Sequence, residues 1–368
     1  MTLPVVVTVC GDPGGAGALA PVLEALIAEG RVSLRNFAYR QATDILSVRN
    51  MPFAAIPTGA DEKWITSQLA ECGARLLLTA TSYRTEEHEK AFIAAARGLG
   101  LRSIAVLDFW ANYGVRFADG SGELRYLPDL ITAMDQASRD GLIADGVPPD
   151  RIVVVGHPGF DAIARQRAAF SAARRAALRT SLGTPDGGLQ VLFASQPLRE
   201  LYGADESSTT FRGFHEHSVL DAVIESLEAS AKLTGRAIQL VVRPHPREEA
   251  EPYQTRHSAL IGIVVSKDGD ARECAMGSDL VIGMTTMLLV EACYLGVPTV
   301  SLQPDLQRPN MLPELPGLVI VRRQADVAPA LADAVGRAMR APQSKVVAVP
   351  APAAPVVAGL VYSMLGLT

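Results

Sequence analysis

Short apolar runs alternate with stretches of helical period along most of the chain, and this alternation constrains the fold more than any other feature. In the first half, strand-like runs at Pro4–Cys10, Val32–Phe37, Arg75–Thr79 and Ser103–Leu107 are separated by helix-like stretches. Strands that alternate with helices predict a doubly wound parallel sheet with right-handed crossovers. Because 368 residues exceed what one hydrophobic core usually holds, we expect two such domains.

The alternation is interrupted once. An alanine- and arginine-rich stretch, Ala162–Leu182, has helical but no strand character, and the glycine-rich turn Gly183–Gly188 follows it. We therefore predict an N-terminal domain over residues 1–164, a linker helix and loop over 165–188, and a C-terminal domain over 189–345. Residues 346–368 form a Pro/Ala tract and an apolar segment. We expect that tail to end in a helix that packs back on the N-terminal domain, because its apolar face needs burial.

Composition narrows the class of protein. The chain is 48% hydrophobic and carries a net charge of −5, and it has no concentrated basic stretch, so we expect no nucleic-acid partner. Its four cysteines show no C-x-x-C spacing, which favours reduced thiols and a cytoplasmic location. No apolar run approaches the roughly 18 residues of a membrane span. Peripheral membrane contact and a homodimer are both left open.

The segment Asp279–Gln303 is the most informative part of the chain about function. It predicts a buried strand (Asp279–Gly283), a helix that begins at Thr285 and Thr286 and ends at Gly296, and a second strand (Thr299–Leu302). The turn then lies at the carboxyl edge of a parallel sheet, where open α/β folds bind ligands. Backbone N–H groups and hydroxyls at a helix N-terminus suit a phosphate or carboxylate.

Two interpretations of these residues stay open. In the first, Thr285 and Thr286 bind an anion, and Glu291 accepts hydrogen bonds from sugar or ribose hydroxyls. In the second, a threonine only caps the helix and Glu291 is only a solvated position.

The other end of the chain has a glycine-rich turn after the first strand, with Gly11, Gly14, Gly15 and Gly17. Glycines let the backbone approach a ligand closely. Asp12, at the carboxyl end of the strand, is a candidate general base for an acceptor hydroxyl. The alternative for Asp12 is a turn residue before Pro13.

A cationic cluster follows a strand of the second half. His245 stands between two prolines and is flanked by Arg243 and Arg247, and this combination suits a diphosphate. A lone histidine is more often structural. We also assign Ser195 and Gln196, at the end of the second half's first strand, and Lys267 to nucleotide or donor contacts.

Asp108, followed by Phe109 and Trp110, comes after a strand of the first half. Asp108 competes with Asp12 for the role of base, and Trp110 offers a ring on which a sugar could stack; the alternative is ordinary packing. His215, Glu216 and His217 lack convincing metal-ligand spacing, so we predict no metal site and favour capping or solvent-facing roles.

Four motifs in order resemble the glycosyltransferase-B fold superfamily, which includes UDP-N-acetylglucosamine 2-epimerases and transferases of bacterial envelope polysaccharides. They are the turn GDPGGAGAL, the hinge-like RIVVVGHPGFDAI at Arg151–Ile163, RPHPR at Arg243–Arg247, and the strand–turn–helix with GVPTVSLQP. The resemblance implies two Rossmann-like domains facing across a cleft. It also implies an acceptor side in the first domain, with Gly14, Gly15 and Trp110, and a nucleotide-sugar site in the second.

The function implied is transfer of a sugar from a UDP-, CMP- or CDP-linked donor to a hydroxyl of an envelope glycan or a small acceptor, with no cofactor. One alternative is a UDP-N-acetylglucosamine 2-epimerase, hydrolysing or not. Against it, the first turn here lacks the arginine and glutamate of the epimerases, and the helix after Thr286 has only Glu291 in place of their paired acids. A non-catalytic nucleotide-sugar-binding protein is the third alternative.

Overall fold

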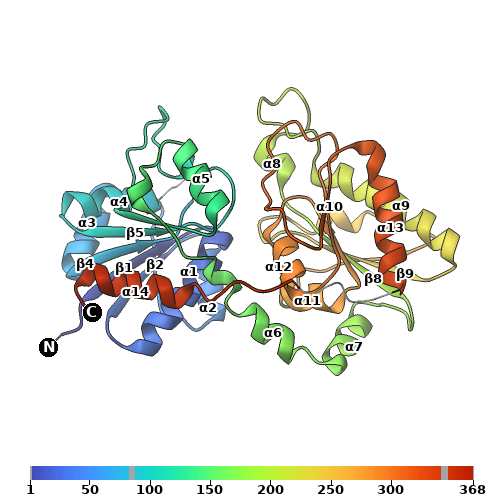
Figure 1. Cartoon of the computed structure of the whole chain (residues 1–368), viewed down its shortest axis with the longest axis horizontal. Coiled ribbons are helices and arrows are strands. Elements are labelled where there is room, and N and C mark those ends of the chain that lie inside the picture. Colours follow the sequence, from blue (N-terminus) through green and yellow to red (C-terminus); the bar gives the residue numbers. More distant parts are fainter. Residues whose placement is uncertain (1, 83–87, 341–346, 368) are drawn as a thin grey trace. The chain divides into compact units, whose positions relative to one another are not determined.

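The structure is a computed structural model that describes residues 2–82, 88–340 and 347–367. The chain divides into two compact units, Met1–Asp161 with Pro350–Thr368 and Ala162–Val349 (Figure 1). Each unit has its own parallel sheet with helices, so the predicted α/β fold class with two doubly wound sheets is confirmed. The predicted boundary between the second domain and the tail, 345/346, lies outside the described residues.

The first unit holds a seven-stranded sheet in its described residues, in the order β3-β2-β1-β4-β5-β6-β7. The strands are β1 (Val5–Cys10), β2 (Ser33–Ala38), β3 (Ala54–Ala55), β4 (Ala74–Thr79), β5 (Arg102–Val106), β6 (Leu130–Ala133) and β7 (Ile152–Val154). The helices are α1 (Pro13–Glu29), α2 (Ala42–Val48), α3 (Glu62–Glu71), α4 (His88–Gly98), α5 (Gln136–Ala144) and α14 (Ala354–Leu365), with 3-10 turns η1 (Gly114–Arg116), η2 (Pro149–Arg151) and η3 (Pro158–Phe160).

Alternation along the strands explains the layers of this unit. On β1, Val6 points into a core shared with α1, α2 and α14, whereas Val7 and Val9 point into a core shared with α3 and α4. Side chains of successive strand residues face opposite sides of a sheet, so both faces are covered.

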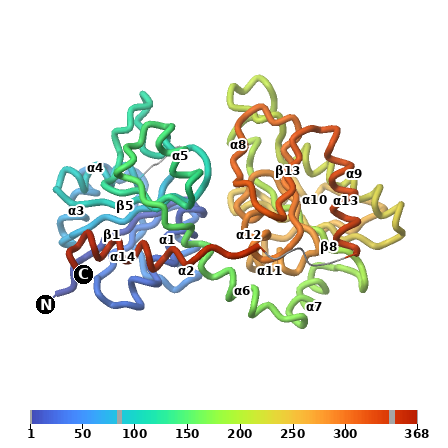
Figure 2. Tube along the Cα trace, viewed as in Figure 1, coloured from blue at the N-terminus to red at the C-terminus, as the bar shows by residue number. Residues whose placement is uncertain are grey.

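The last helix returns to the first unit. Helix α14 packs on α1, as the red and blue segments of Figure 2 show, and it buries Val357, Val361 and Tyr362. The Asp161 carboxylate accepts the backbone N–H groups of Ala353 and Ala354 at 2.8 and 2.7 Å. The carboxylate thus satisfies two N–H groups that have no partner within the helix.

The second unit holds a six-stranded sheet in its described residues, in the order β10-β9-β8-β11-β12-β13. The strands are β8 (Leu189–Ala194), β9 (Ile238–Arg243), β10 (Gly262–Val265), β11 (Leu280–Gly283), β12 (Thr299–Leu302) and β13 (Leu318–Val321). The helices are α6 (Ile163–Ala169), α7 (Ala172–Ser181), α8 (Leu198–Tyr202), α9 (Glu216–Thr234), α10 (Glu251–Gln254), α11 (Ala271–Gly277), α12 (Met287–Leu295) and α13 (Val327–Arg340), with the 3-10 turn η4 (Gln324–Asp326).

The stretch predicted as one linker helix differs in the structure. It forms two helices, α6 and α7, because Ser171 caps α7 through its side chain. Arg175 and Arg179 of α7 bind the Asp279 carboxylate at 2.6 and 2.9 Å. These ion pairs tie α7 to the second unit, so the stretch is part of that unit and not a free linker.

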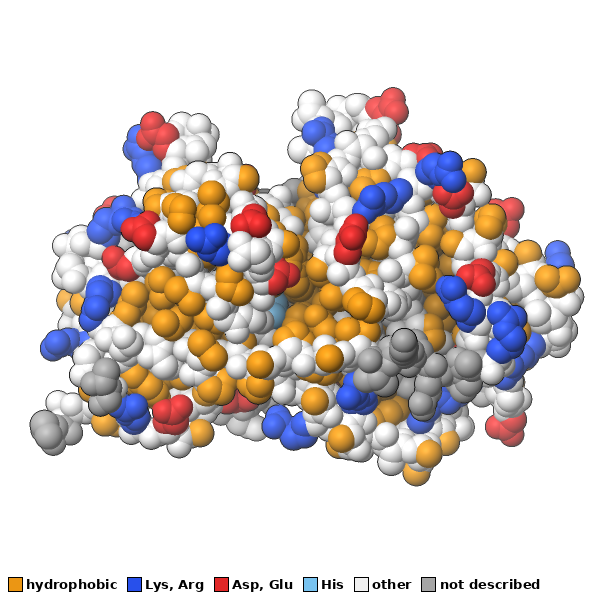
Figure 3. Space-filling model, in the orientation of Figure 1, with side chains coloured by type: hydrophobic (Ala, Val, Ile, Leu, Met, Phe, Trp, Pro, Cys, Tyr) orange, Lys and Arg blue, Asp and Glu red, His pale blue; other side chains and the backbone are white. Residues whose placement is uncertain are grey.

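Charge is spread over the molecule. On the face shown in Figure 3, acidic and basic side chains are intermixed over much of the surface. Among the described residues, none of the helices combines the length and apolar character that crossing a bilayer requires.

Candidate functional site

Both sheets have a switch point, where chain connections leave a central strand in opposite directions. In the first sheet β1 lies between β2 and β4, and in the second β8 lies between β9 and β11. Ligands of open α/β sheets bind outside the carboxyl ends of the strands at such points. Asp12 follows β1 and Gln196 follows β8, so both switch points carry residues singled out by the sequence.

At the second switch point, the loops after β8, β9 and β11 meet. The backbone N–H of Ser195 donates to the carbonyl oxygen of Arg243 at 3.0 Å, and the backbone N–H of Thr285 donates to Gln196 Oε1 at 2.7 Å. The structure therefore brings the predicted residues Ser195, Gln196, Arg243 and Thr285 to one edge of the second sheet.

The donors of Thr285 are turned inward. Thr285 is fully buried, and its hydroxyl also donates to Gln196 Oε1, at 3.1 Å. Gln196 therefore braces the turn between β11 and α12, and neither its side-chain oxygen nor the Thr285 donors point to a ligand. This corrects the prediction of direct contact for Thr285, whereas ligand contact by the partly exposed Gln196 stays a prediction.

Thr286 is the N-cap of α12, and its hydroxyl accepts the Leu288 N–H at 3.4 Å. The residue is partly exposed. The capping interpretation is correct. The Leu289 N–H also donates to the Thr286 carbonyl oxygen, at 3.1 Å. The positive end of the helix dipole still favours an anion at this end of α12.

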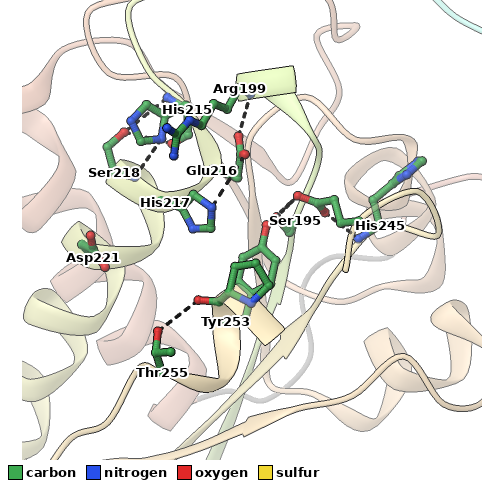
Figure 4. A network of polar contacts seen from close by, with 12 residues as sticks. Ser195, Arg199, His215, Glu216, His217, Ser218, Asp221, His245, Tyr253 and Thr255 are labelled. Carbon is green, nitrogen blue, oxygen red and sulfur yellow. Dashed lines mark hydrogen bonds and ion pairs between the residues drawn. The ribbon is translucent and has the colours of Figure 1, made fainter. Parts of the chain in front are cut away.

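His245 is held by a network on one side of the same edge (Figure 4). Glu248 accepts the His245 backbone N–H at 2.7 Å, the Tyr253 hydroxyl at 2.5 Å and the Ser195 hydroxyl at 3.2 Å. Ser195 also lies 2.7 Å from the Tyr253 hydroxyl, and it is 3% exposed. Ser195 thus belongs to the support of the His245 loop, contrary to the predicted ligand contact.

The protonation state of His245 follows from its surroundings. Burial, with the nearby charges of Arg247 and Lys267, lowers its pKa to about 4. Its Nδ1 accepts the Arg247 backbone N–H at 3.2 Å. The imidazole is therefore neutral at pH 7, and because Nδ1 accepts, Nε2 carries the hydrogen and is the donor.

This environment predicts a pH dependence of stability. An unfolded histidine has a pKa near 6.5, so between pH 6.5 and 4 the unfolded chain binds more protons at His245 than the folded one. The free energy of unfolding should therefore fall as the pH is lowered through this window, by up to about 3 kcal/mol from this residue. We expect urea titrations at pH 7 and 4.5 to show a smaller fall for His245→Asn, whose Oδ1 can still accept the Arg247 N–H. Equal falls in both proteins would contradict the assignment.

Arg243 and Lys267 brace loops. Arg243 donates to the carbonyl oxygens of Asp268 and Gly269 at 2.8 and 2.6 Å, and Lys267 Nζ donates to the carbonyl oxygen of Glu248 at 2.7 Å. Both cations still lend positive potential to the edge around His245. Because their side chains bond to backbone carbonyl oxygens, we assign Arg243 and Lys267 a supporting role in place of the predicted direct contact with a nucleotide or donor.

Glu291 is not a solvated position. It forms an ion pair with Arg272 at 2.6 Å, and both side chains are about one-sixth exposed. Arg272 also donates to Gln166 of α6 at 2.9 Å. The pair ties α12 to α11 and α6, so the carboxylate predicted for ribose or sugar hydroxyls has a partner in its own unit.

The histidine-containing start of α9 has capping and packing roles. His215 caps α9, and its ring accepts the Ser218 N–H. Burial is the main cause that lowers the pKa of His217, whose ring lies 5.1 Å from that of Tyr253. Glu216 accepts the Arg199 N–H at 2.9 Å. No group of potential metal ligands occurs in the part of the chain that the structure describes.

A hollow of about 460 Å³ opens beside this network, lined by residues from the loop after β8, the start of α9 and the loop after β9, among them Pro197, Glu216, His217, Arg247 and Tyr253. It adjoins the His245 loop, because Arg247 and Glu248 both line it. His245 itself does not line the hollow, which lies on the side of the network that His217 and Tyr253 face.

In the first unit, Asp12 is the N-cap residue of α1 by position, but its side chain makes no capping hydrogen bond. It forms an ion pair with Arg40 at 3.2 Å, and the two side chains are 20% and 22% exposed. Asp12 is therefore a partly exposed carboxylate at the switch point of the first sheet.

Asp108 has a different environment. Its Oδ1 accepts Arg116 Nη1 at 2.7 Å and the Thr81 hydroxyl at 3.2 Å, and the Arg116 side chain is only 2% exposed. A β-carbon at Gly14 would overlap Asp108 Oδ2. Asp108 thus belongs to a buried ion pair that packs against α1, which argues against the predicted role of base.

The glycines of the first turn make room for side chains of this unit. A β-carbon at Gly11 would overlap the Tyr39 ring, and one at Gly15 would lie 2.8 Å from the β-carbon of Ala80. Gly14 and Gly15 are therefore explained by internal packing and not by the approach of an acceptor. Gly17 has open space at its α-carbon.

Trp110 is anchored within its unit. Its indole N–H donates to Asp135 Oδ2 at 2.6 Å, and its ring lies nearly parallel to those of His157 and Phe160, with centroids 6.5 and 6.4 Å away. The packing interpretation accounts for these contacts. A sugar-stacking role stays a prediction.

Sequence reasoning missed several residues that build the two edges. Tyr39 donates to the 3%-exposed Glu89 at 2.5 Å, and burial raises the pKa of that carboxyl. Arg116 and Tyr253 were also missed. Glu248, three residues after His245, was the one with a local signal, since an acid beside a cationic motif suggests a partner.

Comparison with solved structures shows which fold this is. UDP-GlcNAc 2-epimerase from Neisseria meningitidis, bound to UDP-GlcNAc, has a TM-score of 0.68 at 15% identity, with 99% of this chain and 100% of that one covered. The enzyme from Methanocaldococcus jannaschii has a TM-score of 0.67 at 15% identity, covering 98% and 99%. Anabaena HepE in complex with UDP has a TM-score of 0.61 at 15% identity, covering 100% and 97%.

No protein-family model matches the sequence, and no curated protein shows detectable similarity to it. The structural likeness extends over both units and shows that this chain shares the two-domain fold of these proteins, as the sequence motifs predicted. At identities near 15%, this likeness concerns the fold.

Proposed function

We propose that the protein is an enzyme that acts on a UDP-linked sugar, whose diphosphate binds at the carboxyl edge of the second sheet. The observation that carries this is the end-to-end likeness to proteins solved with UDP or UDP-GlcNAc. It is supported by the chemistry of that edge, where His245 carries an Nε2–H donor and α12 begins at Thr286.

This proposal assigns fewer residues to the phosphates than the sequence predicted. Gln196, Thr285 and Ser195 bond to other residues of the unit, so we assign the diphosphate to His245 and to the first turn of α12 with Thr286. Arg243 and Lys267 contribute potential without direct contact.

His245→Ala should weaken UDP binding about 10- to 100-fold, because a hydrogen bond to a charged group contributes roughly 1.5–3 kcal/mol. Isothermal titration calorimetry with UDP measures this. His257→Ala is a matched control, since His257 is an exposed histidine of the same unit and should leave affinity unchanged. Wild-type affinity in His245→Ala would place the diphosphate elsewhere.

Two reactions are compatible with such a site. Epimerisation at C2 has the support of the neighbouring structures, which are UDP-GlcNAc 2-epimerases. Inversion at C2 breaks a C–H bond and remakes it on the opposite face, and so needs acid–base groups on the sugar. We place this reaction first.

Transfer to a hydroxyl is the second candidate, favoured by one observation. Among the described residues at the first switch point, the carboxylates of Asp108 and Glu89 are buried and bonded, and that of Asp12 is partly exposed. One base suffices to activate an acceptor hydroxyl. In both reactions we assign the acid–base role to Asp12.

One incubation separates these reactions. Purified protein is mixed with UDP-GlcNAc alone, and the products are resolved by ion-exchange chromatography and proton NMR. Appearance of the 2-epimer supports epimerisation. Release of UDP only when a hydroxyl acceptor such as a short glycan is added supports transfer. Binding of UDP-GlcNAc without any conversion in either mixture would favour a non-catalytic binding protein.

A further inference from the structure

The turn that carries Asp12 is bonded to a second turn, which follows β2. The Tyr39 N–H donates to the carbonyl oxygen of Cys10 at 3.2 Å, and the Ala42 N–H donates to that of Gly11 at 3.1 Å. Arg40 lies between these two contacts. The backbone of Arg40 is therefore fixed relative to the backbone that precedes Asp12.

Tyr39 makes this junction rigid. Its ring covers the α-carbon of Gly11 so closely that a β-carbon there would overlap it. The ring is 5% exposed, and its hydroxyl is anchored on the buried Glu89, which Ser82 also bonds at 2.9 Å. The two turns thus share a buried polar anchor beneath them.

Arg40 itself has an unusual backbone. Its φ is +52°, in the left-handed region that side chains with a β-carbon disfavour. Such outliers persist where the surrounding structure imposes them, and they concentrate at functional sites. The Arg40 guanidinium lies 5.2 Å from the Tyr39 ring centroid and reaches Asp12 Oδ1 at 3.2 Å.

We propose that Arg40 is a positioning residue for Asp12: its constrained backbone and its contact with the Tyr39 ring direct the guanidinium so that it holds the Asp12 carboxylate in one orientation. This inference rests on the acid–base role of Asp12 in the proposed function. Among the described residues, Glu89 and His88 also face this junction: the charge of Asp12 helps to raise the pKa of Glu89, and the His88 ring centroid lies 4.7 Å from that of Tyr39.

The first test needs no substrate. Protein labelled with ¹³C at aspartate carboxyls is titrated by NMR, and the Asp12 signal is assigned by its loss in Asp12→Asn. An aspartate beside an arginine has its pKa lowered by about 1–3 units. Arg40→Gly should therefore move the midpoint of the Asp12 titration upward. An unchanged midpoint would overturn the inference.

The second test separates positioning from mere stabilisation. Glycine adopts φ near +52° without strain, so Arg40→Gly should keep a melting temperature close to wild type while consumption of UDP-GlcNAc falls about 10²-fold, as expected for a displaced catalytic group. Arg40→Lys should keep the low titration midpoint, because the charge remains, but lose most of the turnover, because an ammonium lacks the planar fork of arginine.

Asn50→Gly is the matched control. Asn50 also has a left-handed backbone, with φ of +54°, but it lies after α2, outside the Asp12 junction. This variant also places glycine at a left-handed position, and it should leave turnover and the Asp12 midpoint unchanged. Wild-type turnover in Arg40→Gly would contradict the inference. If the wild-type protein itself consumes no UDP-GlcNAc, that result counts against the proposed function instead. The NMR titration would then still decide the role of Arg40.

Discussion

Replacing Asp12 by asparagine should lower the turnover of UDP-GlcNAc by roughly 10²- to 10⁴-fold, the usual contribution of a positioned acid–base group. Asparagine has nearly the same shape but cannot accept the proton. The affinity for UDP should stay close to wild type, because the diphosphate is assigned to the other unit. Initial rates give the first quantity, and calorimetry with UDP gives the second.

Asp44→Asn provides the control for this prediction. Asp44 is an exposed aspartate in the first turn of α2, in the same unit. It should leave both turnover and UDP affinity unchanged. If Asp12→Asn turns over UDP-GlcNAc at the wild-type rate, the acid–base group must be sought elsewhere on the chain.

The elements that were predicted well have local signals. Strand β12 occupies the predicted residues Thr299–Leu302, and α12 is closed by Gly296, which adopts φ of +85° as a helix-ending glycine does. The predicted helix Ala162–Leu182 fails for an equally local reason, since the cap at Ser171 divides it. Helix α2 was missed because its seven residues carry little helical periodicity.

The position of the candidate site was predictable in outline, because strand ends that follow one another in a doubly wound sheet meet at one edge. The directions of its side chains were not. Thr285 bonds to Gln196, 89 residues away, and Ser195 bonds to Tyr253, 58 residues away. Local sequence shows which residues can donate hydrogen bonds but not which distant acceptors they meet, so donors expected to face a ligand bond within the unit.

The same limit explains why the sequence left two aspartates competing for the role of base. Both follow strands of the first unit, and sequence pattern did not distinguish them. Arg116, which pairs with Asp108, is the last residue of the 3-10 turn η1, and no charged pattern surrounds it in the sequence. Only the tertiary contact shows that Asp108 neutralises a buried guanidinium, while Asp12 keeps part of its surface in solvent.

Asp108→Ala should therefore act mainly on stability. It would leave the Arg116 guanidinium, whose side chain is 2% exposed, without its carboxylate. Removing one partner of a buried ion pair lowers the free energy of unfolding by about 3–5 kcal/mol. For a unit of this size, that corresponds to a fall in melting temperature of roughly 6–20 °C, which differential scanning calorimetry measures.

A double variant separates two contributions to this loss of stability, the unpaired charge of Arg116 and the loss of packing at Asp108. Asp108→Leu combined with Arg116→Leu removes both charges, and apolar replacement of a whole buried pair is often neutral or stabilising. The double variant should therefore have a higher melting temperature than Asp108→Ala. Asp150→Ala is the control: Asp150 is an exposed aspartate of the same unit, so this variant should keep the wild-type melting temperature. If Asp108→Ala melts within a degree or two of the wild type and instead loses turnover, Asp108 is the catalytic acid and Asp12 its support.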